Sequence, residues 1–136
     1  MIFLLAPALL LFSSVRLGDT CKTGRDKLTG RTVFLTYDVE PEYEGGIAAL
    51  SRSLSKIVSY PDSLISGEID TRYSVSFIVE ANGKISAGRA IHGSSKQIGN
   101  QILKAVKSCR WHPGKCNGKN VPTLYTYSTI IELREN

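Results

Sequence analysis

One stretch of the chain decides the fold: Trp111-His112-Pro113-Gly114-Lys115-Cys116-Asn117-Gly118-Lys119-Asn120-Val121-Pro122, which leads into residues 123–133. Pro-Gly and Asn-Gly supply backbone conformations that other residues resist, so the chain reverses here with a defined geometry. After it, alternate residues share one face: Tyr125, Tyr127, Thr129, Ile131 and Leu133. This period of two predicts a closing β-strand. Its terminal position favours a sheet edge, where an extended peptide from another protein can bind.

The composition predicts one globular domain with a short extension. The chain has 136 residues, of which 42% are hydrophobic and 21% are charged, and its formal net charge is +5. These fractions suit a packed core and argue against general disorder. Six basic residues fall in a segment that has no acidic residue: Lys96, Lys104, Lys107, Arg110, Lys115 and Lys119. We expect a solvated face rather than a nucleic-acid groove, and acidic protein or polymer partners remain compatible with it.

The N-terminus predicts export. Residues 2–12 are all apolar apart from Pro7, and this run is shorter than the roughly 20 residues that a membrane span needs. Residues 1–21 are therefore interpreted as a signal peptide or an N-terminal hydrophobic segment, although no basic residue precedes the run. A buried N-terminal helix is the alternative, and Pro7 argues against it. Export predicts a periplasmic or envelope-associated protein.

The three cysteines are compatible with one disulfide in an oxidising compartment. Cys109 and Cys116 are candidates for a bridge, because they flank the end of a predicted helix and a turn. Cys21 could instead be read as a lipid-attachment site, but Gly18-Asp19-Thr20 fits a bacterial lipobox poorly. One cysteine must remain unpaired in any case.

The first part of the chain is predicted to join the N-terminal segment to the domain. Residues 22–31 are polar and contain two glycines, which is typical of a flexible joint. Residues 32–37 are β-prone and predict a short first strand. The acids that follow alternate along a segment with Pro41 and two glycines: Asp38, Glu40, Glu42 and Glu44. We expect a solvated loop rather than a metal site, because this spacing does not make the carboxylates converge.

The remainder, residues 32–136, predicts an α+β domain in the order helix, hairpin, helix, strand. Ile47, Leu50, Leu54 and Ile57 have helical spacing, and Tyr60-Pro61 ends that helix. Residues 72–80 alternate as a strand, and an Asn-Gly turn at residues 81–84 returns the chain antiparallel. Ser94 or Ser95 caps a second helix, whose apolar stripe consists of Ile98, Ile102, Ala105 and Val106. Two helices on one face of a three-stranded antiparallel sheet satisfy this pattern, with an extra N-terminal strand as an open addition.

No set of residues predicts catalysis, a cofactor or a metal. Cys109, His112 and Cys116 resemble a fragment of a zinc site, but a structural site needs four ligands. A Cys–His nucleophile pair would lack an orienting group and an oxyanion loop. Trp111 is interpreted as a core side chain rather than as a ligand platform. We therefore expect a binding protein rather than an enzyme.

Four segments together resemble the C-terminal domain of TonB-family proteins, especially the form common in Bacteroidetes. The segments are Pro41-Glu42-Tyr43-Glu44-Gly45-Gly46 with the helix after it, Tyr60-Pro61, Val75-Ser76-Phe77-Ile78-Val79-Glu80-Ala81-Asn82-Gly83-Lys84-Ile85, and the Trp111–Pro122 stretch quoted above. The last fits the family pattern Trp-x-Pro-Gly-x-x-x-Gly-x-x-Val. Glu44, Leu64, Glu68 and Thr71 depart from the residues that are usual in the family, so the connection after Tyr60 could follow another path.

The resemblance implies a non-enzymatic periplasmic domain that binds the TonB box, a short extended segment of an outer-membrane receptor. The box would add as a strand beside the last strand, so the partner-binding candidates are Thr123, Leu124, Tyr125, Thr126, Tyr127, Ser128, Thr129 and Ile130. A full energy transducer would also contact inner-membrane motor proteins through a membrane helix and a long linker. Here a joint of about ten residues reaches only about 35 Å. A transducer whose membrane helix lies outside this chain, an envelope-polymer-binding domain and a homodimer remain alternatives.

Overall fold

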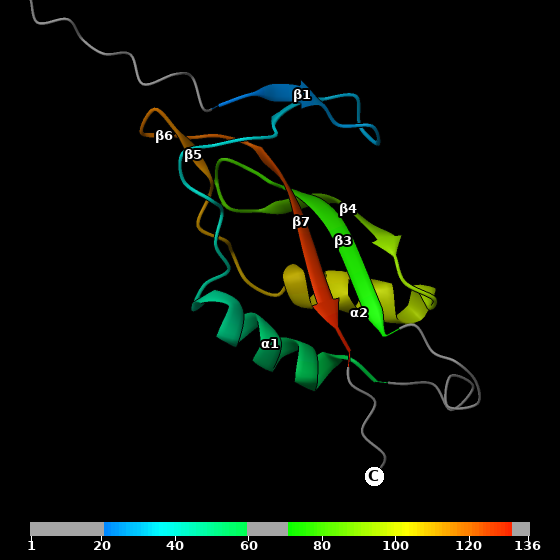
Figure 1. The fold of residues 1–136 in the computed structure, drawn as a ribbon. Helices are drawn as coiled ribbons and strands as arrows, with labels where there is room; N and C mark the ends of the chain where they lie inside the picture. Colours follow the sequence, from blue (N-terminus) through cyan, green and yellow to red (C-terminus); the bar gives the residue numbers. More distant parts are fainter. Residues whose placement is uncertain (1–20, 60–70, 132–136) are drawn as a thin grey trace, which may run out of the picture.

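The computed structural model describes residues 21–59 and 71–131 (Figure 1). Its elements follow in the order β1 (Thr23–Arg25), β2 (Thr32–Phe34), α1 (Gly46–Ile57), β3 (Arg72–Val79), β4 (Ile85–His92), α2 (Lys96–Val106), β5 (Lys115–Cys116), β6 (Lys119–Asn120) and β7 (Thr123–Ile130). The predictions for residues 1–20, Tyr60-Pro61, Leu64, Glu68 and Leu133 fall outside the described residues. Within the described ranges, neither helix has the length and apolar character that crossing a bilayer requires.

The main sheet has five strands in the order β1-β2-β7-β3-β4, not three. Its centre agrees with the prediction, because β3 pairs antiparallel with both β4 and β7. The sheet is nevertheless mixed, since β2 lies parallel to β7 at the single pair Phe34–Thr123. The Phe34 N–H donates to the Pro122 carbonyl at 2.9 Å, which brings the N-terminal hairpin against the start of β7. Sequence periodicity missed this contact because strands of three residues carry almost no periodic signal.

A second sheet, β5 with β6, forms inside the stretch that opened the sequence analysis. Asn117 and Gly118 connect its two strands with positive φ angles of 51° and 74°. A two-residue hairpin turn of this kind requires both residues in the left-handed region, which Asn and Gly tolerate best. The predicted chain reversal is thus a short hairpin.

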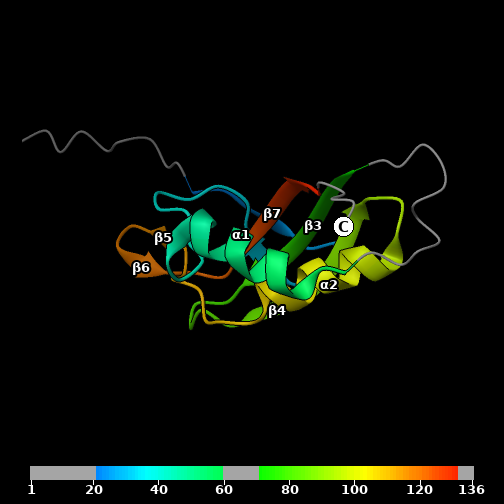
Figure 2. The same ribbon diagram turned by 90° about the horizontal axis from the view of Figure 1, so that it is seen from below.

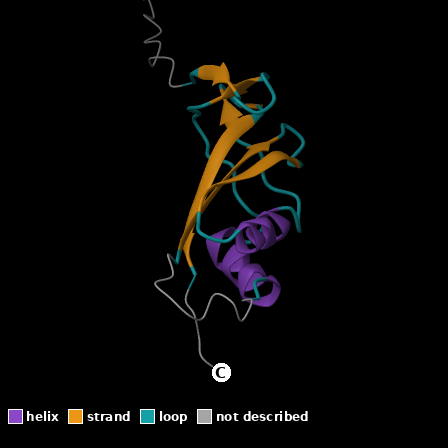
Figure 3. Ribbon diagram, turned by 90° about the vertical axis from the view of Figure 1, so that its right-hand side faces the viewer, coloured by secondary structure: helices purple, strands orange, loops and turns teal. Residues whose placement is uncertain are grey.

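Both helices cover one face of the main sheet, as predicted (Figures 2 and 3). In α1, Leu50 and Leu54 are buried, whereas Ile47 is 70% exposed, contrary to its place in the predicted apolar stripe. Ser95 is the N-cap of α2, and its hydroxyl accepts from the Ile98 N–H at 3.3 Å. All four residues of the predicted α2 stripe are buried.

Trp111 lies in the core, as predicted. It is 4% exposed, and its indole N–H donates to the Val106 carbonyl at 2.8 Å, so burial leaves no unpaired polar group. Its ring lies edge-on to Phe77, with centroids 5.1 Å apart, and to Tyr125, with centroids 5.6 Å apart. Trp111 therefore links the end of α2 to β3 and β7.

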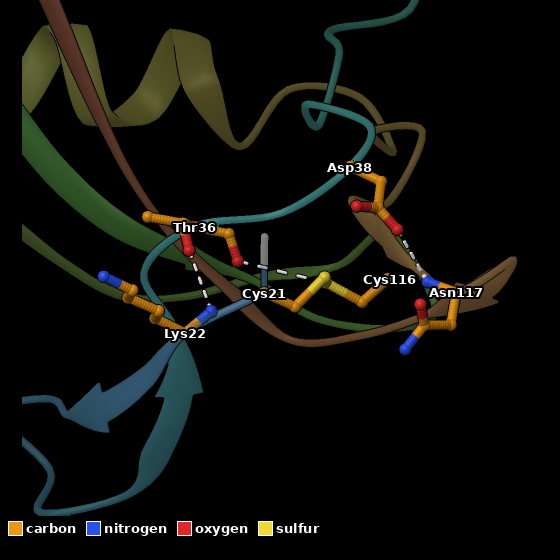
Figure 4. Close-up of a disulfide and its surroundings, with 6 residues drawn as sticks. All are labelled: Cys21, Lys22, Thr36, Asp38, Cys116 and Asn117. Atoms are coloured by element: carbon orange, nitrogen blue, oxygen red, sulfur yellow. Dashed lines mark hydrogen bonds between the residues drawn. A yellow bond between two sulfur atoms is a disulfide. The ribbon is translucent and has the colours of Figure 1, made fainter. Parts of the chain in front are cut away.

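The segment of residues 22–31, predicted as a flexible joint, contains β1 and a hairpin turn that are fastened to the domain. Asp26 is buried and pairs with Arg89 of β4. A disulfide joins Cys21 to Cys116, with 6.1 Å between the Cα atoms, and Cys109 is the free thiol (Figure 4). Of the pairings that the sequence left open, the candidate Cys109–Cys116 bridge is thus not formed, because the hairpin brings a distant cysteine to β5. A sulfur held in this disulfide cannot also carry a lipid thioether.

Candidate functional site

The backbone N–H and C=O groups of successive residues in β7 point to opposite sides of the strand. Its register with β3 is uninterrupted from Arg72–Ile130 to Val79–Thr123, and just beyond it the Ile131 N–H donates to the Thr71 carbonyl at 2.8 Å. In an antiparallel ladder, hydrogen-bonded pairs alternate with non-bonded pairs. The odd-numbered residues of β7 therefore direct their N–H and C=O groups toward β3.

The even-numbered residues of β7 consequently direct their backbone groups away from β3, toward the outer edge. Pro122 follows this rule, since its carbonyl accepts from Phe34 on the outer side. The outer side of β7 is paired with β2 at Thr123, and within the described ranges no strand pairs with it beyond that residue. The backbone groups of Thr126, Ser128 and Ile130 thus face an open edge. The expected edge strand is present from that point onward, although its beginning is flanked by β2.

The other open edges of the sheet are less suited to accept a strand. β4 has two irregularities in its pairing with β3, and Ala87 within it has a φ of 51°, so the strand is bulged. Bulges and short strands are the usual protection of exposed edges. β1 has only three residues. Of the described strands, β7 is the one whose open edge is both long and regular.

A groove of about 790 Å³ follows this edge of β7. Ile47 and Ser51 of α1 line one side of it, and Ser74 of β3 and His92 of β4 also contribute to its lining. Figures 1 and 2 show α1 running below the outer side of β7, while α2 lies under β3 and β4. A segment added to the edge would therefore lie beside α1.

The side chains of the eight candidate residues lie on two different faces of the sheet. Thr123 is fully buried and paired with Phe34, so it does not face the groove. The side chains of Tyr125, Tyr127 and Thr129 all point toward the helices, and Tyr127 is buried. Leu124, Thr126, Ser128 and Ile130 occupy the opposite face, where the Ser128 and Ser74 hydroxyls lie 2.7 Å apart. The groove includes every candidate from Tyr125 to Ile130.

A second pocket of about 230 Å³ opens beside the same strand on the helix-facing side. Its lining residues are Glu40, Pro41, Glu42, Tyr43, Ile47, Leu50, Trp111, Tyr125 and Tyr127. Burial raises the pKa of the Tyr125 hydroxyl, and the negative charge of Glu40 adds to that rise. The same two causes raise the pKa of Tyr37.

Sequence reasoning placed Glu40 and Glu42 in a solvated loop and did not connect them with β7. Both are exposed, as expected, but the segment pairs with the quoted stretch through Val39–Lys115 and Glu42–His112. The signal was an alternation: Pro41 and Tyr43 are buried, whereas the neighbouring acids are exposed. A period of two is typical of extended segments that pack one face.

The chemistry of a metal or nucleophile centre finds no support in the described residues. The one group with converging ligand types is Cys21, Asp38 and Cys116, and its two sulfurs form the disulfide. Because the sulfur of Cys116 is held in the disulfide, it is not a free thiolate ligand that could join Cys109 and His112, the other residues of the fragment that resembled a zinc site.

Comparison with family models identifies the fold. Residues 57–130, more than half of the chain, match the Gram-negative bacterial TonB protein C-terminal family. The chain belongs to this TonB C-terminal family. The match includes the three central strands and α2, whereas nearly all of α1 precedes it. A comparison with curated proteins found no match.

Membership of the TonB C-terminal family establishes the general role of the protein. It is a TonB-like protein-interaction module linked to TonB-dependent transport, and the family implies an envelope location. Such modules act by binding proteins such as outer-membrane receptors rather than by catalysis.

Proposed function

We propose that this TonB C-terminal domain binds an extended segment of an outer-membrane receptor in the periplasm by strand addition along β7. The supporting observation is the regular outer edge of that strand, where the backbone groups of Thr126 and Ser128 have no strand partner among the described residues. Backbone ladder bonds supply affinity that depends little on sequence, and neighbouring side chains supply selectivity. Under this proposal the hydrophobic segment before Cys21 directs export, and the hairpin of residues 22–31 belongs with residues 32–136 to the binding domain.

The experiment is a calorimetric titration with synthetic peptides from the N-terminal segments of outer-membrane TonB-dependent receptors. Thr126→Pro removes an outward N–H and places the proline ring at the open edge, where proline is tolerated by the fold. We expect this variant to lose binding by about tenfold or more, because backbone hydrogen bonds are missing from the added strand.

Thr126→Val is the matched control. It keeps the N–H and the β-branched shape while removing the hydroxyl, so we expect its affinity to stay near that of the parent chain. Circular dichroism verifies that both variants retain the helices. Equal affinity of the proline variant and the parent for a binding peptide would rule out the proposed edge.

A second candidate function has one observation in its favour. The six basic residues between Lys96 and Lys119 are all exposed, as predicted for a solvated face, and could contact anionic envelope polymers. Binding of that kind weakens steeply with added salt and is indifferent to Thr126→Pro. Titrating an anionic envelope polysaccharide at low and high salt separates it from strand addition.

A further inference from the structure

We propose that the pocket beside Tyr125 receives a lysine or arginine side chain of the segment that binds along β7. This inference rests on the proposed strand addition and specifies the chemistry of the partner. The pocket is the one of about 230 Å³ between the Glu40–Glu42 segment, the start of α1 and the helix-facing side of β7.

The position of the pocket follows from strand geometry. Side chains of an added strand alternate between the two faces of the sheet, so every second residue of the visitor points to the helix-facing side. On that side it meets the row of β7 side chains that includes Tyr125 and Tyr127, both of which line the pocket. Ile47 lines both this pocket and the groove along the edge, so the two are adjacent.

The walls of the pocket suit a long side chain with an apolar stem. Tyr43, Leu50 and Trp111 are core residues that present part of their surface to it. Their positions are set from within the domain: the Tyr43 hydroxyl lies 2.8 Å from the Ser108 hydroxyl, and its ring meets Trp111 edge-on with centroids 5.6 Å apart. Lys and Arg pack their methylene stems on such surfaces while the charged end stays near water, and aromatic rings attract the cation.

The negative charges of Glu40 and Glu42 at the pocket favour a visiting side chain that ends in a positive charge. Glu40 and Glu42 are exposed, and within the described part of the chain neither carboxylate has a hydrogen bond or ion pair. Burial and then the negative charge of Glu40 raise the pKa of Tyr125, so the Glu40 carboxylate acts on the wall of the pocket that Tyr125 forms. The exposed His112 pairs with Glu42 through the backbone and does not line the pocket. The acids are thus available to a visiting cation.

The test uses a displayed library of short random peptides selected against the whole chain. We expect the bound pool to carry a recurring Lys or Arg at one position of an otherwise extended, β-prone sequence. A selected peptide should then bind about tenfold more weakly when norleucine replaces that cation, because the charge-assisted contact is lost while the stem is kept. This measurement needs no protein variant.

The protein side of the test is the double variant Glu40→Gln/Glu42→Gln. We expect it to weaken the cationic peptide by a similar factor and to leave the norleucine peptide unchanged. Glu44→Gln is the matched control, since it removes an exposed acid of the same segment that does not line the pocket, and it should change neither affinity.

The outcomes separate the inference from the proposed function. Selected peptides that are sensitive to Thr126→Pro but carry no recurring cation, or that bind equally to the double variant, would overturn the pocket and leave strand addition intact. Failure to select any peptide, or selected peptides that are indifferent to Thr126→Pro, would overturn strand addition and the pocket with it.

Discussion

Asp26 shows how one buried charge holds the N-terminal hairpin to the domain. It is the one charged side chain among the buried residues that the structure describes. Its carboxylate pairs with Arg89 of β4 and accepts from the N–H and hydroxyl of Thr29, at 2.9 Å and 2.7 Å. The hydrogen bond from Arg89, followed by those from Thr29, lowers the pKa of Asp26 from 3.8 to about 2 against an opposing effect of burial.

This pKa predicts a pH dependence of stability. A carboxyl group with a lowered folded-state pKa stabilises the fold above its unfolded pKa, and the contribution is lost as pH falls through the folded value. We expect Asp26→Asn to lower the free energy of unfolding at pH 6, and the gap from the parent chain to shrink between about pH 4 and pH 2. Urea titrations at several pH values measure it. Glu44→Gln, an exposed acid, is the control, and a gap independent of pH would contradict the prediction.

Replacing each of two glycines with positive φ by alanine separates the cost of the backbone conformation from the cost of a steric clash. A Cβ at Gly118 (φ 74°) would meet nothing within 4 Å, whereas one at Gly83 (φ 81°) would lie 2.1 Å from the Trp111 carbonyl oxygen. We expect Gly118→Ala to lower the free energy of unfolding by about 1 kcal/mol, the conformational penalty alone. Gly83→Ala should cost about 2 kcal/mol more, because the backbone near Trp111 must move. Equal losses in thermal unfolding would show that the Gly83 contact is not tight.

At the scale of elements, the disulfide decides how the N-terminal hairpin is attached. Cys21 and Cys116 are separated by 95 residues in sequence. Near the bridge, the Lys22 N–H donates to the Thr36 hydroxyl at 2.8 Å, and the Asn117 N–H donates to Asp38 at 2.8 Å (Figure 4). The bridge thus joins the residue just before Lys22 and β1 to β5 of the small β5–β6 sheet.

Removing the disulfide should destabilise the protein. We expect Cys21→Ser/Cys116→Ser to lower the free energy of unfolding by about 2–4 kcal/mol, because the cross-link restricts the unfolded chain. Cys109→Ser, which alters the free and half-buried thiol, should cost about 1 kcal/mol or less. Denaturant titrations under oxidising conditions compare the variants. If the two losses were equal, the bridge would not hold the hairpin in solution.

At the scale of the whole molecule, the arrangement of edges predicts the stoichiometry of binding. β4 is bulged, β1 is short, and no described strand pairs with the outer edge of β7 beyond Thr123. We expect one extended peptide to bind each chain, since the described sheet offers a single long and regular edge. Calorimetry with a selected peptide measures the ratio. A ratio of two per chain would mean that the bulged edge of β4 also accepts a strand.

Self-association belongs to the same scale. An edge that accepts a foreign strand can also pair with the same edge of a second copy, so a homodimer remains a proposal for the unoccupied protein. Because both uses need the outward groups of Thr126 and Ser128, a bound peptide and a partner copy would compete for β7.

The sequence by itself determined the α+β class, both helices, the central hairpin and the closing strand. Each of these has a periodic signal over at least eight residues, or a turn dipeptide such as Asn82-Gly83 whose backbone preference is local. The alternation in β7 also placed Tyr125 and Tyr127 on one face, which in the structure is the helix-facing one. Local patterns suffice for such features because they depend on neighbours in the chain.

Only the tertiary structure decided the features that join distant parts of the chain. The pairing of β2 with β7, the Cys21–Cys116 bridge and the approach of Glu40 to Tyr125 each connect residues more than 80 positions apart. Such contacts leave no local period, and three cysteines allow several pairings. The register between β7 and β3 likewise decides which backbone N–H and C=O groups of β7 point outward. This register is a relation between two strands, so the sequence of one strand does not determine it.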